Sequence, residues 1–178
     1  YSYTGNGINP IVGIDEDGLD IEFAEGTSKE YQSAFYEHNQ TLVDAGSTHI
    51  QEIIDNPGVL LTIYEATTTT GVTGGFLAGG DVNGKKTGSL FWSPDLYFLT
   101  KSGKELAPIL ILSHEGGHAS DCLLGKIANY KARSGWGILP GLGFLRDPLE
   151  ASAMKYEWAT ADKLGLNKRA NYKDVKPF

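Results

Sequence analysis

Near the middle of the 178-residue chain, the longest apolar run (Leu106 to Leu112) leads into the pentapeptide His114-Glu115-Gly116-Gly117-His118. In a helix, positions four apart lie one turn apart on the same face, so the two imidazoles would point to one side. Titratable rings in so apolar a helix need a partner that offsets their desolvation. The two glycines each weaken a helix by ~1 kcal/mol relative to alanine, and close packing of this helix against the sheet would explain their presence. The stretch therefore predicts a buried helix that carries two partnered histidines.

The remaining sequence predicts a mixed α+β domain, in which helices are followed by a small, mostly antiparallel sheet and then by two more helices. Capping boxes, in which a Ser or Thr and a Glu three residues later satisfy free N–H groups, mark the first helix and the central one. Apolar, β-branched runs predict strands, and Asn83-Gly84 predicts a hairpin turn. The expected elements are a helical region from Thr27–Glu30 to Ile54 with a break, a strand over 59–64, a return strand over 89–92, a helix from Ser102–Glu105 to about Leu124, and a helix from Asp147 to Leu164.

Composition argues against several classes of partner. Acidic residues outnumber basic ones by 22 to 15, and the net charge of −7 disfavours a nucleic-acid backbone or an anionic membrane as partner. The longest apolar run is too short to span a bilayer. The single cysteine, Cys122, cannot form an internal disulfide. The chain starts at Tyr1 rather than Met and has no basic-then-apolar leader, so we expect a piece of a longer protein.

The spacing of His114 and His118 is that of a zinc site. Two imidazoles one helical turn apart can bind one zinc ion, and Glu115 beside them can reach a water molecule on that ion. Zinc lowers the pKa of such a water towards ~7, and a carboxylate then removes its proton to form a nucleophile. The alternative, a helix with two unconnected histidines, leaves their desolvation without compensation. We therefore expect Zn2+ as cofactor, Glu115 as catalytic base, and structural or solvated roles for His38 and His49.

A catalytic zinc ion needs a third protein ligand and one open position. Glu150 is the expected ligand, because it opens a new helix whose small residues allow a close approach to the histidine helix. Its spacing from Asp147 also fits a capping box, which is its alternative role. Glu157, two turns further on, is the reserve ligand, and Asp121 is better placed to orient an imidazole. The acidic residues considered are Asp121, Asp147, Glu150, Glu157 and Asp162.

Three further features each have a functional and a structural interpretation. The segment Ser89 to Trp92 is either an exposed edge strand that pairs with an extended substrate or an ordinary sheet strand. The apolar, glycine-rich stretch from Gly135 to Phe144 either walls the cleft or packs on its own domain. Tyr156 and Tyr172 are candidate oxyanion stabilisers, but the chain has nine tyrosines, so the presence of a tyrosine does not by itself single out either residue.

The pattern from His114 to His118, followed by a glutamate on a later helix, resembles that of zincin metallopeptidases with two histidine ligands and one glutamate ligand. The resemblance extends over roughly Ser89 to Leu164, and the first motif is its specific part. It implies a zincin fold, a zinc ion held by His114, His118 and Glu150, and peptide hydrolysis with Glu115 as general base and later acid. The helices ahead of the sheet are similar to those of effector metallopeptidases that bacteria deliver into other cells.

The start of the chain is similar to the end of an RHS-repeat core. Such cores end in Asn-Pro and then Asp-Pro-x-Gly-Leu before a variable toxin domain, and here Asn9-Pro10 is followed by Asp15-Glu16-Asp17-Gly18-Leu19. Glu16 stands where the family has proline. The resemblance implies that residues 1–19 are the tail of such a core and that residues 20–178 are the toxin domain. It also implies that the core cuts the chain between Leu19 and Asp20.

These features predict a zinc peptidase that is secreted or delivered into a target cell, where it cleaves a protein or peptide substrate in the cytoplasm. A cognate immunity protein is a further expected partner. Two alternatives stay open. A zinc amidase would act on cell-wall peptide and be toxic only when directed to the periplasm. A non-catalytic binding module would hold a structural zinc ion, with Asp121 or Glu157 closing the open position.

Overall fold

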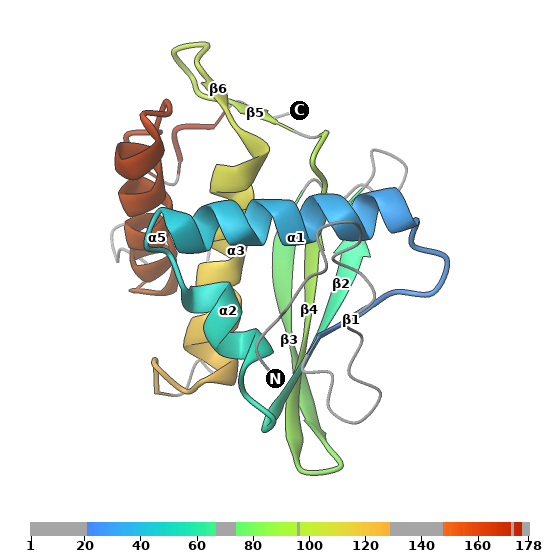
Figure 1. Ribbon diagram of the computed structural model, residues 1–178. Helices are drawn as coiled ribbons and strands as arrows, with labels where there is room; N and C mark the ends of the chain where they lie inside the picture. Colours follow the sequence, from blue (N-terminus) through green and yellow to red (C-terminus); the bar gives the residue numbers. More distant parts are fainter. Residues whose placement is uncertain (1–20, 67–73, 96, 129–147, 172, 176–178) are drawn as a thin grey trace.

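The computed structural model describes residues 21–66, 74–95, 97–128, 148–171 and 173–175 (Figure 1). Helices and strands are mixed in this part of the chain, which confirms the expected α+β class. The expected RHS-type tail at residues 1–19 lies outside the described residues. In chain order the elements are β1 (Ile21–Phe23), α1 (Lys29–Asp44), α2 (His49–Ile54), β2 (Val59–Glu65), β3 (Gly75–Val82), β4 (Lys85–Trp92), β5 (Phe98–Leu99), β6 (Glu105–Leu106), α3 (Pro108–Leu123) and α5 (Pro148–Leu164).

The main sheet has four strands in the order β1-β2-β4-β3, and β5 pairs with β6 in a separate two-stranded sheet. The expectation of a mostly antiparallel main sheet is wrong, because β1 pairs with β2 and β2 pairs with β4 in parallel, and only β3 and β4 are antiparallel. The hairpin places β3 on the outer side of β4, so β4 runs beside β2 in the same direction. A predicted hairpin turn indicates only that the two strands it joins pair with each other, and it does not indicate that β2 lies on the other side of β4.

The turn at Asn83-Gly84 joins β3 to β4 as predicted. Both residues have positive φ, 51° for Asn83 and 80° for Gly84, which is the conformation of a type I′ hairpin turn. The return strand is longer than expected, because β4 begins at Lys85. It also lies between β2 and β3, so the segment Ser89 to Trp92 is an interior strand, and among the described residues β3 is the edge strand on this side of the sheet.

The predicted helix starts need two corrections. The N-cap of α1 is Ser28, whose Oγ accepts a hydrogen bond from the Tyr31 N–H at 3.1 Å, rather than Thr27. The second capping box, at 102–105, does not start a helix: Glu105 lies in β6, and α3 begins at Pro108. Proline suits the first position of a helix, where its missing N–H would lack an intrahelical partner in any case. Pairing with β5 takes precedence there over the local capping signal.

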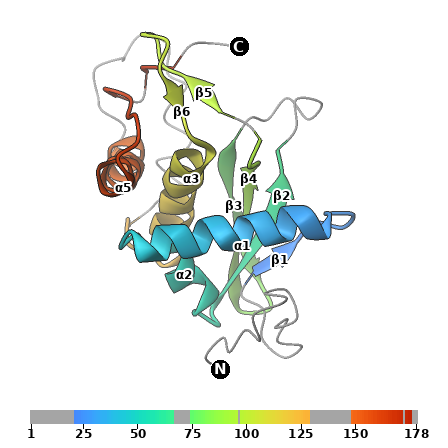
Figure 2. The same cartoon turned by 45° about the horizontal axis from the view of Figure 1, so that its top comes forward.

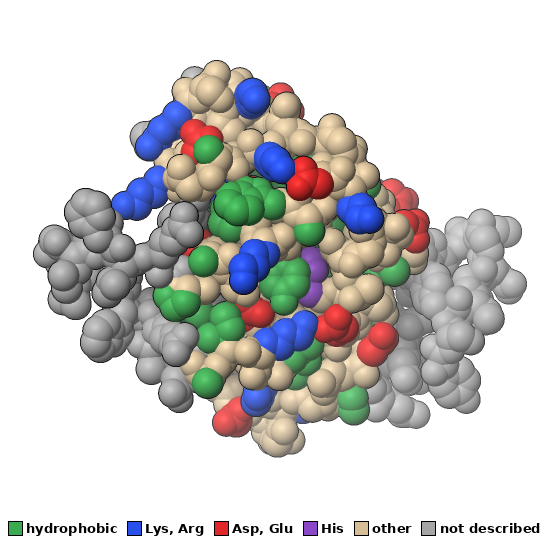
Figure 3. Space-filling model, turned by 90° about the vertical axis from the view of Figure 1, so that its left-hand side faces the viewer, with side chains coloured by type: hydrophobic (Ala, Val, Ile, Leu, Met, Phe, Trp, Pro, Cys, Tyr) green, Lys and Arg blue, Asp and Glu red, His purple; other side chains and the backbone are tan. Residues whose placement is uncertain are grey.

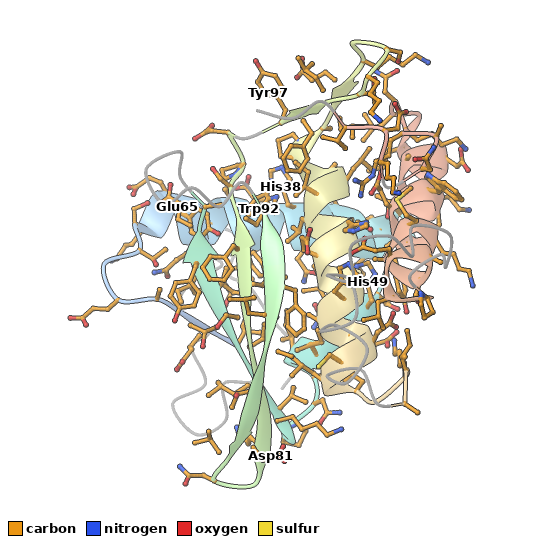
Figure 4. All side chains as sticks on the ribbon, turned by 180° about the vertical axis from the view of Figure 1, so that it is seen from behind. His38, His49, Glu65, Asp81, Trp92 and Tyr97 are labelled. Carbon is orange, nitrogen blue, oxygen red and sulfur yellow. The ribbon has the colours of Figure 1, made fainter. Side chains whose placement is uncertain are left out.

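The core lies between one face of the sheet and the helices. Every second side chain of β2 from Val59 to Ile63 is buried, as the twofold period of a strand requires. Trp92 at the end of β4 joins the layers. Its ring lies 4.9 Å from that of His38 on α1, and its Nε1 donates to the Pro108 carbonyl at the start of α3, 2.8 Å away. Figure 4 shows this junction from the face of the sheet that no described helix covers.

Helices α3 and α5 lie side by side to one side of the sheet (Figures 1 and 2). Three buried hydroxyl groups link them to the chain that leads into α2: the Thr160 Oγ1 on α5 lies 2.9 Å from Ser113 Oγ on α3 and 2.8 Å from Ser47 Oγ. No helix among the described residues combines the length and the apolar character that crossing a membrane requires.

Candidate metal centre

The two glycines of the pentapeptide bring α3 close to its neighbouring helices. A β-carbon at Gly117 would lie 2.6 Å from Cδ2 of Tyr156 on α5, and one at Gly116 would lie 2.5 Å from Cγ1 of Ile50 on α2. Both distances are shorter than real β-carbons show, so neither position has room for a larger residue. The close packing inferred from these glycines is therefore present, but it is made with helices α2 and α5 and not with the sheet.

This packing brings Glu150 of α5 between the two histidines of α3. The Nε2 atom of His114 lies 3.2 Å from one Glu150 carboxylate oxygen, and the Nε2 atom of His118 lies 3.5 Å from the other. The two imidazole rings are nearly perpendicular, with centroids 4.9 Å apart. His114 and His118 are buried, at 3% and 7% exposure. One ligand atom from each of the three residues lies within 4.8 Å of the others.

The arrangement fits a zinc ion. Two ligand atoms bound tetrahedrally to one zinc at 2.0–2.1 Å lie roughly 3.3 Å apart. Each histidine nitrogen lies near that distance from a different oxygen of Glu150, at 3.2 Å for His114 and 3.5 Å for His118. Although the Oε2 atom of Glu150 is close to His114, it is buried without a hydrogen-bond partner among the described residues. Buried polar atoms as a rule have a partner, and a bound cation would supply one to this oxygen. His114, His118 and Glu150 are also the chemical types that zinc prefers.

The electrostatics of the group favour a cation. Burial alone would lower the pKa of His114, but the carboxylates of Glu150 and Glu157 beside its two ring nitrogens raise that pKa to about 9. Burial alone would raise the pKa of Glu150, but the imidazoles of His114 and His118 lower it to about 2. Without a metal ion, a proton on His114 therefore supplies the positive charge between these residues. A divalent cation would take the place of that proton.

Glu157, the reserve ligand, lies on the other side of His114. Its Oε2 atom is 3.1 Å from Nδ1 of His114, and its carboxylate is only 2% exposed. If His114 bound a metal ion through Nε2, its ring proton would be on Nδ1 and could be donated to a carboxylate in this position. Glu157 would then orient His114, a role that the sequence argument gave to Asp121. The Oδ1 atom of Asp121 instead accepts a hydrogen bond from the Tyr156 hydroxyl at 3.3 Å.

Arg169, which the sequence argument did not select, holds Glu157. Its Nε donates to both carboxylate oxygens of Glu157 at 3.0 Å, and its Nη2 lies 2.9 Å from Nδ1 of His114. Arg169 is 7% exposed. It belongs to the C-terminal segment (residues 165–171 and 173–175) that follows α5, and its carbonyl accepts a hydrogen bond from Nε1 of Trp158 at 2.9 Å. The segment also contains Lys168 and Lys173, so no local signal distinguishes this basic residue from its neighbours.

The other candidates are not part of the group. Tyr156 packs on His49, with ring centroids 4.6 Å apart, and burial together with the Asp121 charge raises its pKa to about 12. Its hydroxyl therefore stays protonated and donates to Asp121, and Tyr156 is not among the residues that line the cavity beside His114. Asp162 is exposed and pairs with Lys168. The remaining candidates, Asp147, Tyr172 and the stretch 135–144, lie outside the described residues.

A cavity of about 310 Å³ lies beside His114. Glu115, Glu157 and Arg169 also line it. The other walls are largely apolar and are formed by Gly74, Phe98, Leu106, Leu110, Ile111 and Val175, with Lys173 in addition. Glu115 therefore faces the same open space as the first histidine ligand.

A second cavity, of about 430 Å³, is lined by residues of α2, of the turn that precedes it and of α5. Its lining includes His49, Glu52, Lys155 and Tyr156. Basic and acidic side chains are interspersed with apolar ones on the face that α5 presents in Figure 3. Among the described residues, only the group of His114, His118 and Glu150 brings three potential metal ligands together.

The sequence matches no protein-family model, and comparisons with curated proteins and with solved structures gave no match.

Proposed function

We propose that this protein is a zinc-dependent hydrolase of peptide bonds, of the zincin type. The observation that carries the proposal is the group of His114, His118 and Glu150, with Glu115 lining the same cavity as His114. Three protein ligands leave one position of a tetrahedral ion open, as catalytic zinc sites do. A structural site would need a fourth protein ligand, and the two residues expected for that role have other partners: Tyr156 for Asp121 and Arg169 for Glu157.

When bound, zinc supplies a Lewis acid that makes water acidic near neutral pH and polarises the substrate carbonyl. Residues of the chain would transfer the protons and orient the metal ligands. The Glu115 carboxylate accepts a proton from the attacking water and later donates it to the nitrogen of the leaving amine. Glu157, held by Arg169, keeps the Nδ1 proton of His114 in place and fixes the orientation of the ring.

The position of the edge strand β3 favours a substrate that binds in an extended conformation. It starts at Gly75, next to Gly74 in the wall of the cavity, and its regular pairing with β4 continues to Ala78. The outer edge of such a strand offers unpaired backbone groups to a peptide chain. A polypeptide lying there would lead towards Glu115 and the metal ligands.

The test combines metal analysis with activity. Glu115→Gln keeps the shape of the side chain and removes the base, so we expect one zinc ion per chain and a loss of peptide cleavage of roughly 10²- to 10⁴-fold. Glu37→Gln, at an exposed position of α1, is the matched control and should keep full activity. Wild-type activity in the Glu115→Gln protein would remove Glu115 from the mechanism, and absence of bound zinc in the wild type would refute the proposal.

We further propose that the domain is a toxin delivered into another cell as the end of an RHS-type protein. This part rests on the resemblance of residues 1–19 and on the hydrolytic site. Expression in the bacterial cytoplasm should stop growth, and Glu115→Gln should relieve the effect. Toxicity confined to periplasmic expression would favour a cell-wall amide as the substrate. Cleavage between Leu19 and Asp20 can be read from the N-terminus of the domain released from a longer chain.

A further inference from the structure

We propose that an exposed basic surface at the β5–β6 hairpin binds an acidic segment of the substrate polypeptide. This hairpin surface consists of five exposed side chains from the hairpin (residues 97–106) and the C-terminal segment: Tyr97, Leu99, Lys101, Lys104 and Lys173. It adjoins the cavity beside His114, because Phe98 and Lys173 line that cavity. The inference rests on the proposed function, which it extends from the reaction to the class of substrate.

Charge is unevenly distributed over the described residues. The hairpin and the C-terminal segment contain five basic residues and only two acidic ones, Glu105 and Asp174. The other described residues contain six basic and fifteen acidic ones. Basic side chains lie along the upper end of the molecule in Figure 3, where Figure 1 places the hairpin. An acidic peptide is therefore attracted to this end, whereas a flat anionic bilayer would also meet the acidic excess elsewhere.

The three lysines of the hairpin surface are available to an acidic partner. Lys101, Lys104 and Lys173 are exposed, and none of them forms an ion pair with another residue that the structure describes. The other two basic residues of the hairpin and the C-terminal segment already have acidic partners. A carboxylate from outside the domain would therefore compete with no existing ion pair.

The carboxylate of Asp174 fixes the two parts of the hairpin surface against each other. Its Oδ1 atom accepts a hydrogen bond from the Lys101 N–H at 3.2 Å, and its Oδ2 atom accepts one from the Ala170 N–H at 3.0 Å. Within the turn, the Thr100 N–H donates to the Lys104 carbonyl at 2.8 Å. The backbone that carries the lysines is thus held in place before a partner arrives, which lowers the entropic cost of binding.

Two exposed apolar side chains accompany the lysines. Tyr97 is 50% exposed and Leu99 is 37% exposed, whereas Phe98 between them is half-buried and lines the cavity. This alternation is that of a strand with one inward and one outward face. Figure 4 shows Tyr97 at the hairpin end of the molecule, directed away from α3. A bound segment would therefore cover an aromatic ring as well as meet positive charge, as protein interfaces commonly do.

The surface lies where a substrate would pass. A β-carbon at Gly74, next to the start of β3, would lie 3.8 Å from Cζ of Phe98. The edge strand that we propose to bind an extended peptide therefore begins beside the hairpin. Gly74 and Phe98 line the same cavity as Glu115. A polypeptide that follows this edge to Glu115 would bring a flanking segment next to the lysines.

The first experiment measures binding without cleavage. The Glu115→Gln protein, as purified, is titrated with fluorescent peptides of one length and one apolar pattern that carry four glutamates, four glutamines or four lysines. We expect the glutamate peptide to bind about tenfold more tightly than the glutamine peptide at low salt, and this difference to shrink at about 0.5 M salt, because salt screens exposed charges. Equal affinities of these two peptides, or tightest binding of the lysine peptide, would overturn the proposal.

Lysine substitutions locate the binding surface. Lys101→Gln, Lys104→Gln and Lys173→Gln together should lower the affinity for the glutamate peptide about tenfold, because each exposed ion pair contributes a factor of about 1.4 to 5. The matched control has the same net charge and replaces three exposed lysines elsewhere: Lys29→Gln, Lys86→Gln and Lys155→Gln. Its affinity should stay within about twofold of the parent protein. An equal loss in both proteins would show that only net charge matters and would overturn the proposal.

Cleavage distinguishes a substrate from another acidic partner. For a peptide with an acidic flank, Lys101→Gln with Lys104→Gln should raise KM about fivefold at unchanged kcat, because this contact is the same in the ground state and the transition state. A KM that is indifferent to the acidic flank would overturn the assignment to a substrate. Lysine-dependent binding to phosphatidylserine vesicles, without lysine-dependent binding to the glutamate peptide, would assign the surface to a membrane and overturn the proposal.

The outcomes separate this inference from the proposed function. If zinc is bound and peptides are cleaved without regard to acidic residues, the hydrolase stands and only the hairpin surface is refuted. If the glutamate peptide binds but the protein neither binds zinc nor cleaves peptides, the proposed function fails, and the assignment of the acidic segment to a substrate fails with it.

Discussion

At the scale of single residues, the arrangement around His114 depends on a buried ion pair. Glu157 and Arg169 are almost fully buried, so each compensates the desolvation of the other. Two neighbours compete for Nδ1 of His114: Glu157 accepts its proton, and Arg169 donates to the bare nitrogen. A metal ion on Nε2 would select the first arrangement. Metal binding and the ion pair would then be coupled through one ring.

We predict that Arg169→Met lowers the free energy of unfolding by about 3–5 kcal/mol, because it leaves Glu157 as an unpaired buried charge. Adding Glu157→Met should recover most of that loss, since both charges are then gone. Zinc affinity should nevertheless stay about 10- to 100-fold below wild type in the double variant, which lacks the carboxylate at His114. Urea unfolding and zinc titration measure the two effects.

The exposed pair of Lys168 and Asp162 provides the control, since Lys168→Met should change stability by less than about 1 kcal/mol. Wild-type zinc affinity in the double variant would show that Glu157 does not position His114.

At the scale of elements, α2 packs the buried His49 against α3 and α5. Burial and the nearby Lys126 charge lower the pKa of His49 to about 4, and its ring is 2% exposed. In the unfolded chain the pKa returns to about 6.5, so the unfolded state binds the proton more tightly. The stabilising effect of a neutral His49 is complete above pH 6.5 and is lost as the pH falls from there towards 4.

We therefore predict that the protein loses up to about 3 kcal/mol of unfolding free energy from this group between pH 7 and pH 4. His49→Gln cannot titrate and should remove that part of the pH dependence, whatever its effect at pH 7. Urea unfolding at several pH values gives the comparison. Parallel curves for the two proteins over this range would contradict a neutral, buried His49.

Local sequence signals predicted which helices and strands form better than they predicted which of these elements lie side by side. The helical spacing of His114 and His118, the turn at Asn83-Gly84 and the apolar run that forms β2 were all recognisable, because each depends on residues close in sequence. The parallel pairing of β2 with β4 was not, because a strand's pattern shows which face is buried and not which strand lies beside it. The capping box at 102–105 failed because pairing between β5 and β6 involves residues outside that motif.

The same distinction applies to the candidate site. The two histidines were evident from one helical turn, and the structure brings Glu150 to both of them. The group behind His114 was not evident. The position of Arg169 depends on how the segment after α5 folds back against that helix, which no local pattern encodes. Glu157 was noticed as an acidic residue on the correct helix, but which side of the imidazole it contacts follows only from the packing of α3 against α5.

At the scale of the whole molecule, the three candidate ligands come from two helices that are far apart in sequence, α3 and α5. A bound ion would join them, and only the folded chain holds the three residues together. Binding to the folded state alone adds stability in proportion to the logarithm of free ligand over Kd. The fold and the metal are therefore expected to stabilise each other.

We predict that free zinc at a thousand times its Kd raises the free energy of unfolding by about 4 kcal/mol over that of chelator-treated protein. Glu150→Gln weakens the site and should remove most of this increase, whereas the exposed Glu37→Gln should retain it. Thermal or urea unfolding with and without a chelator provides the measurement. If the free energy of unfolding of the wild-type protein did not change with zinc, a metal centre between α3 and α5 would be contradicted.

The two outer strands of the four-stranded sheet bear on self-association. β1 has three residues, and the pairing of β3 with β4 shifts register between Ala78 and Asp81, where the Gly80 carbonyl accepts a hydrogen bond from the Thr87 hydroxyl. Short or interrupted borders of this kind prevent another copy from extending the sheet over a long, regular stretch. A polypeptide can still align with the four residues from Gly75 to Ala78. The outer edge of β3 could therefore pair with a short extended segment, whereas a long, regular strand pairing of the kind found in fibrils is disfavoured.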